Sequence, residues 1–155
     1  MGEAAPASAP QAVLFACALN SVRSPMAAAL LRRFCGAPLY AASAGVRAAE
    51  VDPFAVAVME EIGIDISAHR PITFEELEDL EGLNFDLIVT LSPEAHHKAL
   101  DLTHRLAAEV EYWPTLDPSA VEGNREQRLD AYRAVRDQII ERIRARFLPP
   151  PIGNV

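Results

Sequence analysis

Two residues near the start of the chain, Cys17 and Arg23, have the types and the spacing needed for chemistry on a phosphate-like group. A cysteine thiolate is a strong nucleophile, and it is favoured close to a helix N-terminus and to a guanidinium. The planar arginine fork can hold two oxygens of a phosphoryl group and neutralise charge during its transfer. A buried structural cysteine beside an unrelated arginine is the alternative interpretation. The five residues between the pair are Ala18, Leu19, Asn20, Ser21 and Val22.

The flanking segments are expected to place this pair at the end of a strand. The apolar run 13–16 is typical of a short buried strand, and the run 26–34 is rich in helix formers. Ser24 is a preferred N-cap residue and Pro25 fits a first helical position, so a helix is predicted to begin there. Backbone N–H groups at a helix N-terminus have no intrahelical partner and bind phosphate-sized anions. We therefore predict an oxyanion-binding loop over residues 17–24.

The remainder of the chain alternates strand and helix patterns. Strands are expected at 37–44, 86–91 and 109–113, and helices at 54–62, 73–80, 93–105 and 125–147. This alternation predicts an α/β fold, namely a single three-layer domain over 11–148 with a four-stranded parallel sheet and helices on both faces. Flexible tails are predicted at 1–10 and 149–155. Ligands of such sheets bind at the carboxyl ends of the strands, which is the edge where Cys17 is expected.

The amino-acid composition argues against several classes of function. The chain has 155 residues, half of them hydrophobic, and a net charge of −8, so the clustered basic surface of a nucleic-acid-binding protein is not expected. No apolar run approaches the ~20 residues that cross a membrane, and the first ten residues lack the pattern of a secretion signal. Two cysteines outside any CxxC pair favour a reducing compartment over a disulfide scaffold or zinc site. We expect a cytoplasmic protein without a metal or other cofactor.

Asp117 is the candidate proton donor. Transfer of a phosphoryl group to a thiolate leaves an alkoxide or phenoxide that needs a proton. Asp117 follows the predicted strand 109–113, so in a parallel sheet it lies on the same edge as Cys17. Its alternative interpretation is an ordinary Asp-Pro turn with Pro118.

The stretch VLFACALNSVRSPMAAAL resembles the opening of the low-molecular-weight protein tyrosine phosphatase family, whose signature is a strand, C-x5-R-S-P and a helix. The likeness continues through the segments 42–45, 67–69, 85–91 and 116–118, and therefore covers nearly the whole chain. It implies the strand order 2-1-3-4, and hydrolysis of phosphomonoesters, with phosphotyrosine proteins as the expected substrate, through a covalent phosphocysteine. It also implies that Asp117 is the acid. The related thioredoxin-coupled arsenate reductases share this scaffold.

Four further residues match positions that support the loop in this family. Asn20, Ser24, Ser43 and His69 would form a hydrogen-bonded network that shapes the loop and stabilises the thiolate. Each also has a local interpretation: Ser24 as an N-cap, and Ser43 and His69 as turn or loop residues. Asn20 is the most informative, because asparagine tolerates the left-handed backbone geometry that tight anion-binding turns often need.

Three positions depart from the family pattern. Leu19 stands where the family usually has glycine, and Val22 stands where many members have a second cysteine. Ser119 follows Asp117-Pro118 where the phosphotyrosine-specific members have aromatic residues. Ser92 stands where thioredoxin-coupled reductases would have one of their two further cysteines. A reductase with this sequence would therefore have to use an external small thiol. Such a reductase is one alternative to the phosphatase, and a non-catalytic phosphate sensor is another.

Overall fold

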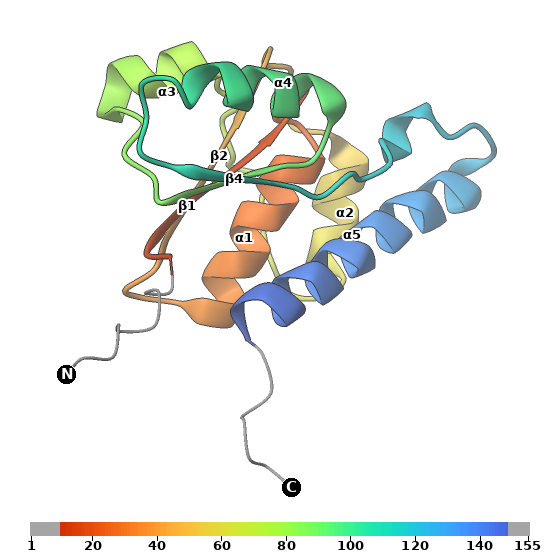
Figure 1. Cartoon of the computed structure of the whole chain (residues 1–155). Coiled ribbons are helices and arrows are strands. Elements are labelled where there is room, and N and C mark those ends of the chain that lie inside the picture. Colours follow the sequence, from red (N-terminus) through yellow and green to blue (C-terminus); the bar gives the residue numbers. More distant parts are fainter. Residues whose placement is uncertain (1–9, 149–155) are drawn as a thin grey trace, which may run out of the picture.

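A computed structural model describes residues 10–148, so the predicted tails lie outside the described residues except for residue 10. A four-stranded parallel sheet forms the centre of the fold (Figure 1). Its strands are β1 (Ala12–Cys17), β2 (Tyr40–Gly45), β3 (Leu87–Thr90) and β4 (Glu109–Tyr112). They are ordered β2-β1-β3-β4, which confirms the predicted α/β class and strand order.

Helices cover both faces of the sheet, as Figure 1 shows. One face carries α3 (Phe74–Glu81) and α4 (Pro93–Leu102). The other carries α1 (Arg23–Cys35), α2 (Pro53–Glu60) and the long α5 (Arg125–Phe147), with a short 3-10 turn, η1 (Pro118–Ala120), just before α5. No helix within residues 10–148 combines the length and apolar character that a membrane span requires.

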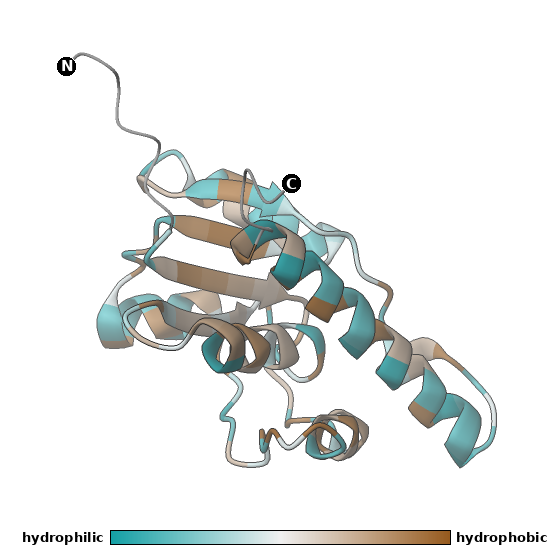
Figure 2. Cartoon of the chain, turned by 90° about the horizontal axis from the view of Figure 1, so that it is seen from below, coloured by the Kyte–Doolittle hydropathy of each residue, from teal (hydrophilic) through white to brown (hydrophobic). Residues whose placement is uncertain are grey.

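Strand β1 lies in the middle of the core and contributes side chains to both layers. Val13, Phe15 and Cys17 belong to the apolar cluster under α1, α2 and α5. Leu14 and Ala16 belong to the cluster under α3 and α4. The period-two alternation of a strand explains this division, and every one of these side chains is buried. Figure 2 shows the resulting hydrophobic strands behind helices with hydrophilic outer faces.

Most predicted boundaries differ from the observed ones by one to three residues, and three of these differences bear on the fold or the site. Strand β2 begins at Tyr40 rather than at residue 37, because Pro38 lacks a ladder donor and Gly36 ends the preceding helix at positive φ. Helix α4 ends at Leu102 rather than at residue 105. Helix α1 begins at Arg23, so Ser24 and Pro25 lie inside its first turn instead of starting it. Pro25 costs little there, since the N–H it lacks would have no intrahelical partner.

Candidate active site

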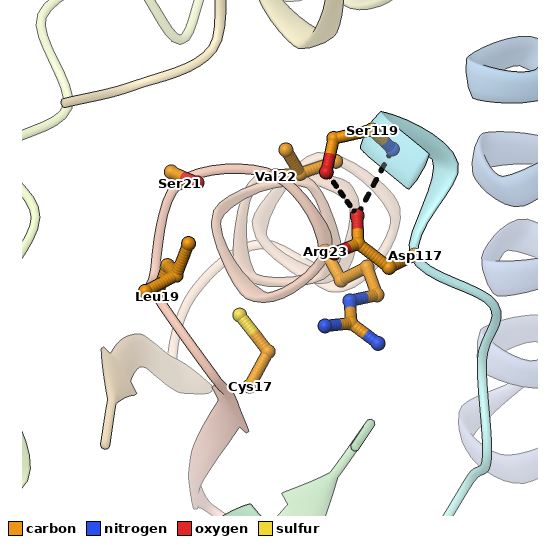
Figure 3. A pocket seen from close by; sticks show the side chains of 7 residues that line it. All are labelled: Cys17, Leu19, Ser21, Val22, Arg23, Asp117 and Ser119. Atoms are coloured by element: carbon orange, nitrogen blue, oxygen red, sulfur yellow. Dashed lines mark hydrogen bonds between the residues drawn. The ribbon is translucent and has the colours of Figure 1, made fainter. Parts of the chain in front are cut away.

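One hollow at the carboxyl edge of the sheet collects the predicted nucleophile, the arginine and the candidate acid. The loop after β1 forms one side of it, and the segment after β4 forms the other (Figure 3). Cys17 is the last residue of β1 and is only 2% exposed, with its sulfur directed into the hollow. The lining residues are Cys17, Leu19, Ser21, Val22, Arg23, Asp117 and Ser119.

The backbone of the loop is fixed from outside by the segment that follows β2. N–H groups of residues 46, 47, 49 and 52 donate to loop carbonyl oxygens at 2.8 to 3.1 Å. The loop therefore turns its carbonyl groups away from the hollow, and Asn20 takes up a left-handed conformation with φ of 55°. The accepting carbonyls belong to Cys17, Ala18, Leu19 and Ser21.

The loop N–H groups are left without partners. Within residues 10–148, the amides of Leu19, Asn20, Ser21 and Val22 donate to no other protein group. Successive unpaired amides followed by a helix N-terminus make a concave site for an anion. The loop thus has the donors that a tetrahedral oxyanion needs.

Gly45 allows the loop to approach β2. A Cβ atom at this position would lie 2.3 Å from the carbonyl oxygen of Arg47 and 2.8 Å from the backbone nitrogen of Asn20. Both neighbours are backbone atoms, so neither can rotate away as a flexible side chain could.

We therefore expect Gly45→Ala to distort the loop that holds the anion. Overpacking of this kind costs about 1 to 3 kcal/mol of folding stability. Inorganic phosphate should bind roughly 10-fold more weakly or worse, since misplaced donors lose charge-assisted bonds. Chemical denaturation and phosphate titration measure the two effects. Gly63→Ala is the control for a loss of stability remote from the loop: its Cβ would meet no atom within 4 Å, but its φ of 79° strains an alanine, so stability should fall while phosphate affinity stays that of the wild type. Equal phosphate affinities in the wild type and Gly45→Ala would contradict this account.

Arg23 is buried and has no carboxylate partner. The residue is 7% exposed, and it takes part in none of the ion pairs between residues 10 and 148. Nη1 donates to the carbonyl of Thr115 at 2.8 Å and more weakly to that of Leu91 at 3.5 Å. These bonds orient the guanidinium and leave Nε and Nη2 available. A buried cation of this kind is costly unless an anion compensates it, so Arg23 favours an oxyanion in the hollow.

Asn20 is the centre of the network predicted from the resemblance. The N–H of Ile72 donates to its Oδ1 at 2.9 Å, which fixes the orientation of the amide. Nδ2 then donates to the hydroxyls of Ser24 at 2.8 Å and Ser43 at 2.9 Å. His69 Nε2 lies 3.1 Å from both the Asn20 backbone carbonyl and Oδ1, so this nitrogen must carry a hydrogen. The structure thus brings all four predicted supporting residues together.

Ser24 is not the N-cap that its residue type suggested. Residue 22 occupies the N-cap position of α1 without a side-chain cap. The Ser24 hydroxyl instead lies 2.9 Å from Cys17 Sγ. Its oxygen already accepts from Asn20, so its hydrogen can be donated either to the sulfur at 2.9 Å or, more weakly, to the carbonyl of Ala44 at 3.5 Å. This contact joins the Cys17 side chain to the network centred on Asn20.

The neutral form of His69 contributes to stability. Burial lowers its pKa below the usual value, the Arg32 charge adds to this, and the hydrogen bond to Asn20 opposes it. The unfolded chain therefore takes up this proton first as the pH falls. The stability conferred by neutral His69 is complete above the unfolded pKa of about 6.5 and is lost as the pH falls through the folded pKa.

We expect the free energy of unfolding to decrease as the pH falls from about 7.5 to about 5, and to decrease less steeply in His69→Asn. Urea unfolding across this range measures both slopes. Because the chain has three other histidines, the difference between the two proteins is the relevant quantity. Identical slopes would show that His69 is as exposed to protonation in the folded chain as in the unfolded one.

Asp117 is held by Ser119. Its Oδ1 accepts from the Ser119 N–H at 3.0 Å and from the Ser119 hydroxyl at 2.7 Å, as the dashed lines of Figure 3 show. Asp117 is also the N-cap of η1, so the predicted Asp-Pro turn is present together with a position on the hollow. From the sequence alone, Ser119 is notable only as the absence of an aromatic residue. Its anchoring role follows a common pattern in which an aspartate caps the residue two positions on.

The second cysteine lies far from this hollow. Cys35 is the last residue of α1, so it is displaced from Arg23 by about 18 Å along the helix axis. A disulfide needs Cα atoms within about 7 Å, which excludes a bond to Cys17 without a large rearrangement. Both thiols are free. Between residues 10 and 148 there is no group of three or more His, Cys, Asp or Glu side chains placed to hold a metal ion.

Known proteins resemble the chain over nearly its full length. A family model described as low molecular weight phosphotyrosine protein phosphatase matches residues 12–148. An arsenate reductase of Halalkalibacterium halodurans is 37% identical over 134 residues, which cover 85% of this chain and 91% of the relative.

Solved structures show the same likeness. A structure titled as an arsenate reductase in the phosphate binding state has a TM-score of 0.66 and 29% identity, covering 87% of this chain and 95% of that chain. A low molecular weight protein tyrosine phosphatase from T. tengcongensis has a TM-score of 0.69 and 28% identity, covering 86% and 95%. Both names, phosphatase and arsenate reductase, thus occur among similar proteins.

Proposed function

The chain belongs to the low molecular weight phosphotyrosine protein phosphatase family, and we propose that it hydrolyses phosphomonoesters through a covalent phosphocysteine at Cys17. One observation carries the proposal: the buried, unpaired Arg23 and the carboxylate of Asp117 line the same hollow as the Cys17 sulfur. A nucleophile, an anion-binding fork and a proton donor are the three parts that this reaction needs.

In the first step, the Cys17 thiolate attacks phosphorus, and the bond between phosphorus and the ester oxygen breaks. The equatorial oxygens are held by the loop amides and by Nε and Nη2 of Arg23, which stabilise the charge of the transition state. Asp117, protonated at this stage, gives its proton to the leaving oxygen. The Ser24 hydroxyl, 2.9 Å from the sulfur, helps to position it for the attack.

In the second step, water attacks the phosphocysteine. Asp117, now a carboxylate, takes a proton from this water, the sulfur–phosphorus bond breaks, and inorganic phosphate leaves. The Cys17 thiolate and the protonated Asp117 are restored. No metal or other cofactor takes part in this scheme.

The expected substrate is a phosphotyrosine protein in a reducing compartment such as the cytoplasm, where the free Cys17 thiol would persist. The rim of the hollow is made of aliphatic and small residues, Leu19, Val22 and Ser119, rather than aromatic ones. This rim provides no aromatic face against which a phenyl ring could stack.

Arsenate reduction with an external thiol is the second candidate, and the names of similar proteins favour it. Arsenate has the shape and charge of phosphate and would fit the same loop. Cys17 would displace a hydroxyl from arsenic, and an external thiol would attack the Cys17 sulfur. As the sulfur–arsenic bond breaks, its two electrons pass to arsenic, which leaves as arsenite, and Cys17 is left in a mixed disulfide with the external thiol. A second external thiol then reduces this disulfide. The distant Cys35 could not replace these external thiols.

Parallel assays separate the two candidates. We expect purified protein to hydrolyse p-nitrophenyl phosphate at the same rate with and without EDTA. Arsenate with glutathione, or with glutaredoxin and glutathione, should give little arsenite in comparison. Thiol-dependent arsenite formation without phosphomonoester hydrolysis would reverse the assignment, and loss of hydrolysis in EDTA would contradict the metal-free scheme.

A further inference from the structure

A groove beside the hollow carries two arginines that form no ion pair within residues 10–148. It runs from Ser21 of the loop along the start of α2 to Phe54 and reaches Arg125 and Arg128 at the start of α5. Ser21 borders both this groove and the hollow that holds Cys17. Arg128 also borders a second depression that begins at Ser119. The surface is therefore continuous from the nucleophile to the arginines on two sides.

The acidic residues nearest in sequence to Arg125 and Arg128 already form ion pairs with another arginine. Glu126 and Asp130 both pair with Arg133, at 2.6 Å each. Arg125 and Arg128 form none of the ion pairs found between residues 10 and 148. Like charges three residues apart on a helix repel each other, so an anion placed between them would be stabilised.

Phe54 holds the two guanidinium groups in place. The Cζ atom of Arg128 lies 4.5 Å from the centre of the ring, and that of Arg125 lies 5.4 Å away. Such cation–π contacts leave the edges of a guanidinium, which carry its N–H donors, available to an acceptor. The ring is itself packed against Tyr132, with centroids 5.3 Å apart.

The acids that border the groove form no ion pair with either arginine in the described part of the chain. Asp52 is engaged, because its Oδ1 accepts from the Phe54 N–H at 2.8 Å and its Oδ2 from the Tyr132 hydroxyl at 2.6 Å. Glu50 is exposed on the loop side of the groove, and Glu122 is exposed in the depression beyond Ser119. An incoming anion is therefore repelled at those borders and attracted at the arginine end.

We propose that Arg125 and Arg128 form a specificity subsite for a glutamate or aspartate side chain flanking the phosphorylated residue of a peptide substrate. A peptide fits better than a small phosphate ester, because the groove combines this charged end with an apolar stretch of Val51, Pro53 and Phe54. The inference deepens the proposed function and rests on it. It assigns to the enzyme a preference for acidic phosphopeptides despite the net charge of −8.

Matched phosphotyrosine peptides test the proposal. Each pair differs only in carrying Glu or Gln at one position, from two residues before the phosphotyrosine to two after it. For wild type, kcat/KM should be about 3- to 10-fold higher for the Glu peptide at one or more of these positions, the range for two partly exposed charge pairs. This ratio should decline towards one at high salt, because screening weakens exposed pairs.

Variants locate the effect. Arg125→Gln combined with Arg128→Gln should bring the ratio close to one, and reversal of both charges to Glu should favour a Lys peptide. Arg142→Gln is the matched control: this arginine lies on the same helix over the ring of Trp113, at 5.7 Å, and has no ion pair within the described part of the chain. It is about 25 Å along the helix axis from Arg125, so its ratio should equal that of the wild type.

The outcomes separate this proposal from the one on which it rests. Hydrolysis of p-nitrophenyl phosphate with equal rates on Glu and Gln peptides at every position would overturn the subsite and leave the phosphatase intact. An arginine-dependent preference for a small bisphosphate but not for acidic peptides would overturn the peptide as occupant. Failure to hydrolyse any phosphomonoester would overturn both.

Discussion

Cys17→Ser should lose phosphatase turnover by about 10⁴-fold or more, the scale seen when a covalent nucleophile is removed. A serine hydroxyl is hardly ionised at neutral pH and is a far weaker nucleophile than a cysteine thiolate. The loop donors do not depend on the sulfur, since the segment after β2 fixes them through backbone hydrogen bonds. Phosphate should therefore still bind to the variant. Steady-state kinetics and phosphate titration measure the two properties.

Cys35→Ser is the matched control for this experiment. It makes the same atomic replacement at the other end of α1, about 18 Å away along the helix. We expect its turnover to stay within about 2-fold of wild type, because Cys35 is only partly buried and packs at the edge of the core. Substantial activity in Cys17→Ser, or equal losses in both variants, would contradict a nucleophilic role for Cys17.

Asp117→Asn should lose roughly 10²- to 10⁴-fold on substrates with poor leaving groups, the usual range for general acid catalysis. An asparagine can keep the contact with the Ser119 N–H, so the geometry of the turn should survive while the proton is lost. An aryl phosphate with an activated leaving group should lose less, because its departing oxygen carries negative charge more readily.

The burst phase is the appropriate readout for Asp117→Asn. It reports formation of the phosphocysteine alone, whereas slow hydrolysis of the intermediate could mask the leaving-group effect at steady state. Glu122→Gln, a nearby exposed carboxylate outside the hollow, serves as the control. Equal burst losses for good and poor leaving groups in Asp117→Asn would leave Asp117 as a structural turn residue.

The sequence predicted the architecture well because the fold depends on patterns that are local. Apolar runs of strand length alternate with helical segments, and this alternation leaves few arrangements other than a parallel sheet covered on both faces. The strand order came from family resemblance alone. The start of α1 was predicted wrongly because a Ser-Pro pair is an ordinary helix start, and nothing in the pair shows that the Ser24 hydroxyl is bonded to Cys17.

Only those parts of the site that depend on side-chain type could be predicted from the sequence. Cys17 and Arg23 are close in sequence, and Asp117 follows from its position at the end of a parallel strand. The segment that orients the loop was not predictable, because its backbone N–H groups act irrespective of residue type. Gly45 had a partial signal as a glycine at a strand end, but its close approach to Asn20 requires the three-dimensional arrangement. The pair Arg125 and Arg128 becomes distinctive only when the ion pairs of Arg133 are known.

Direct detection of the intermediate tests the central claim most sharply. Asp117→Asn, mixed rapidly with an activated aryl phosphate and quenched in acid, should accumulate a protein carrying one additional phosphoryl group. Mass spectrometry of the digest should place this group on the peptide that contains Cys17, and Cys17→Ala treated in the same way should carry none. The contrary result is a wild-type enzyme that forms product in the burst while neither it nor Asp117→Asn carries a phosphoryl group on Cys17 at any quench time. This result would contradict the phosphocysteine mechanism.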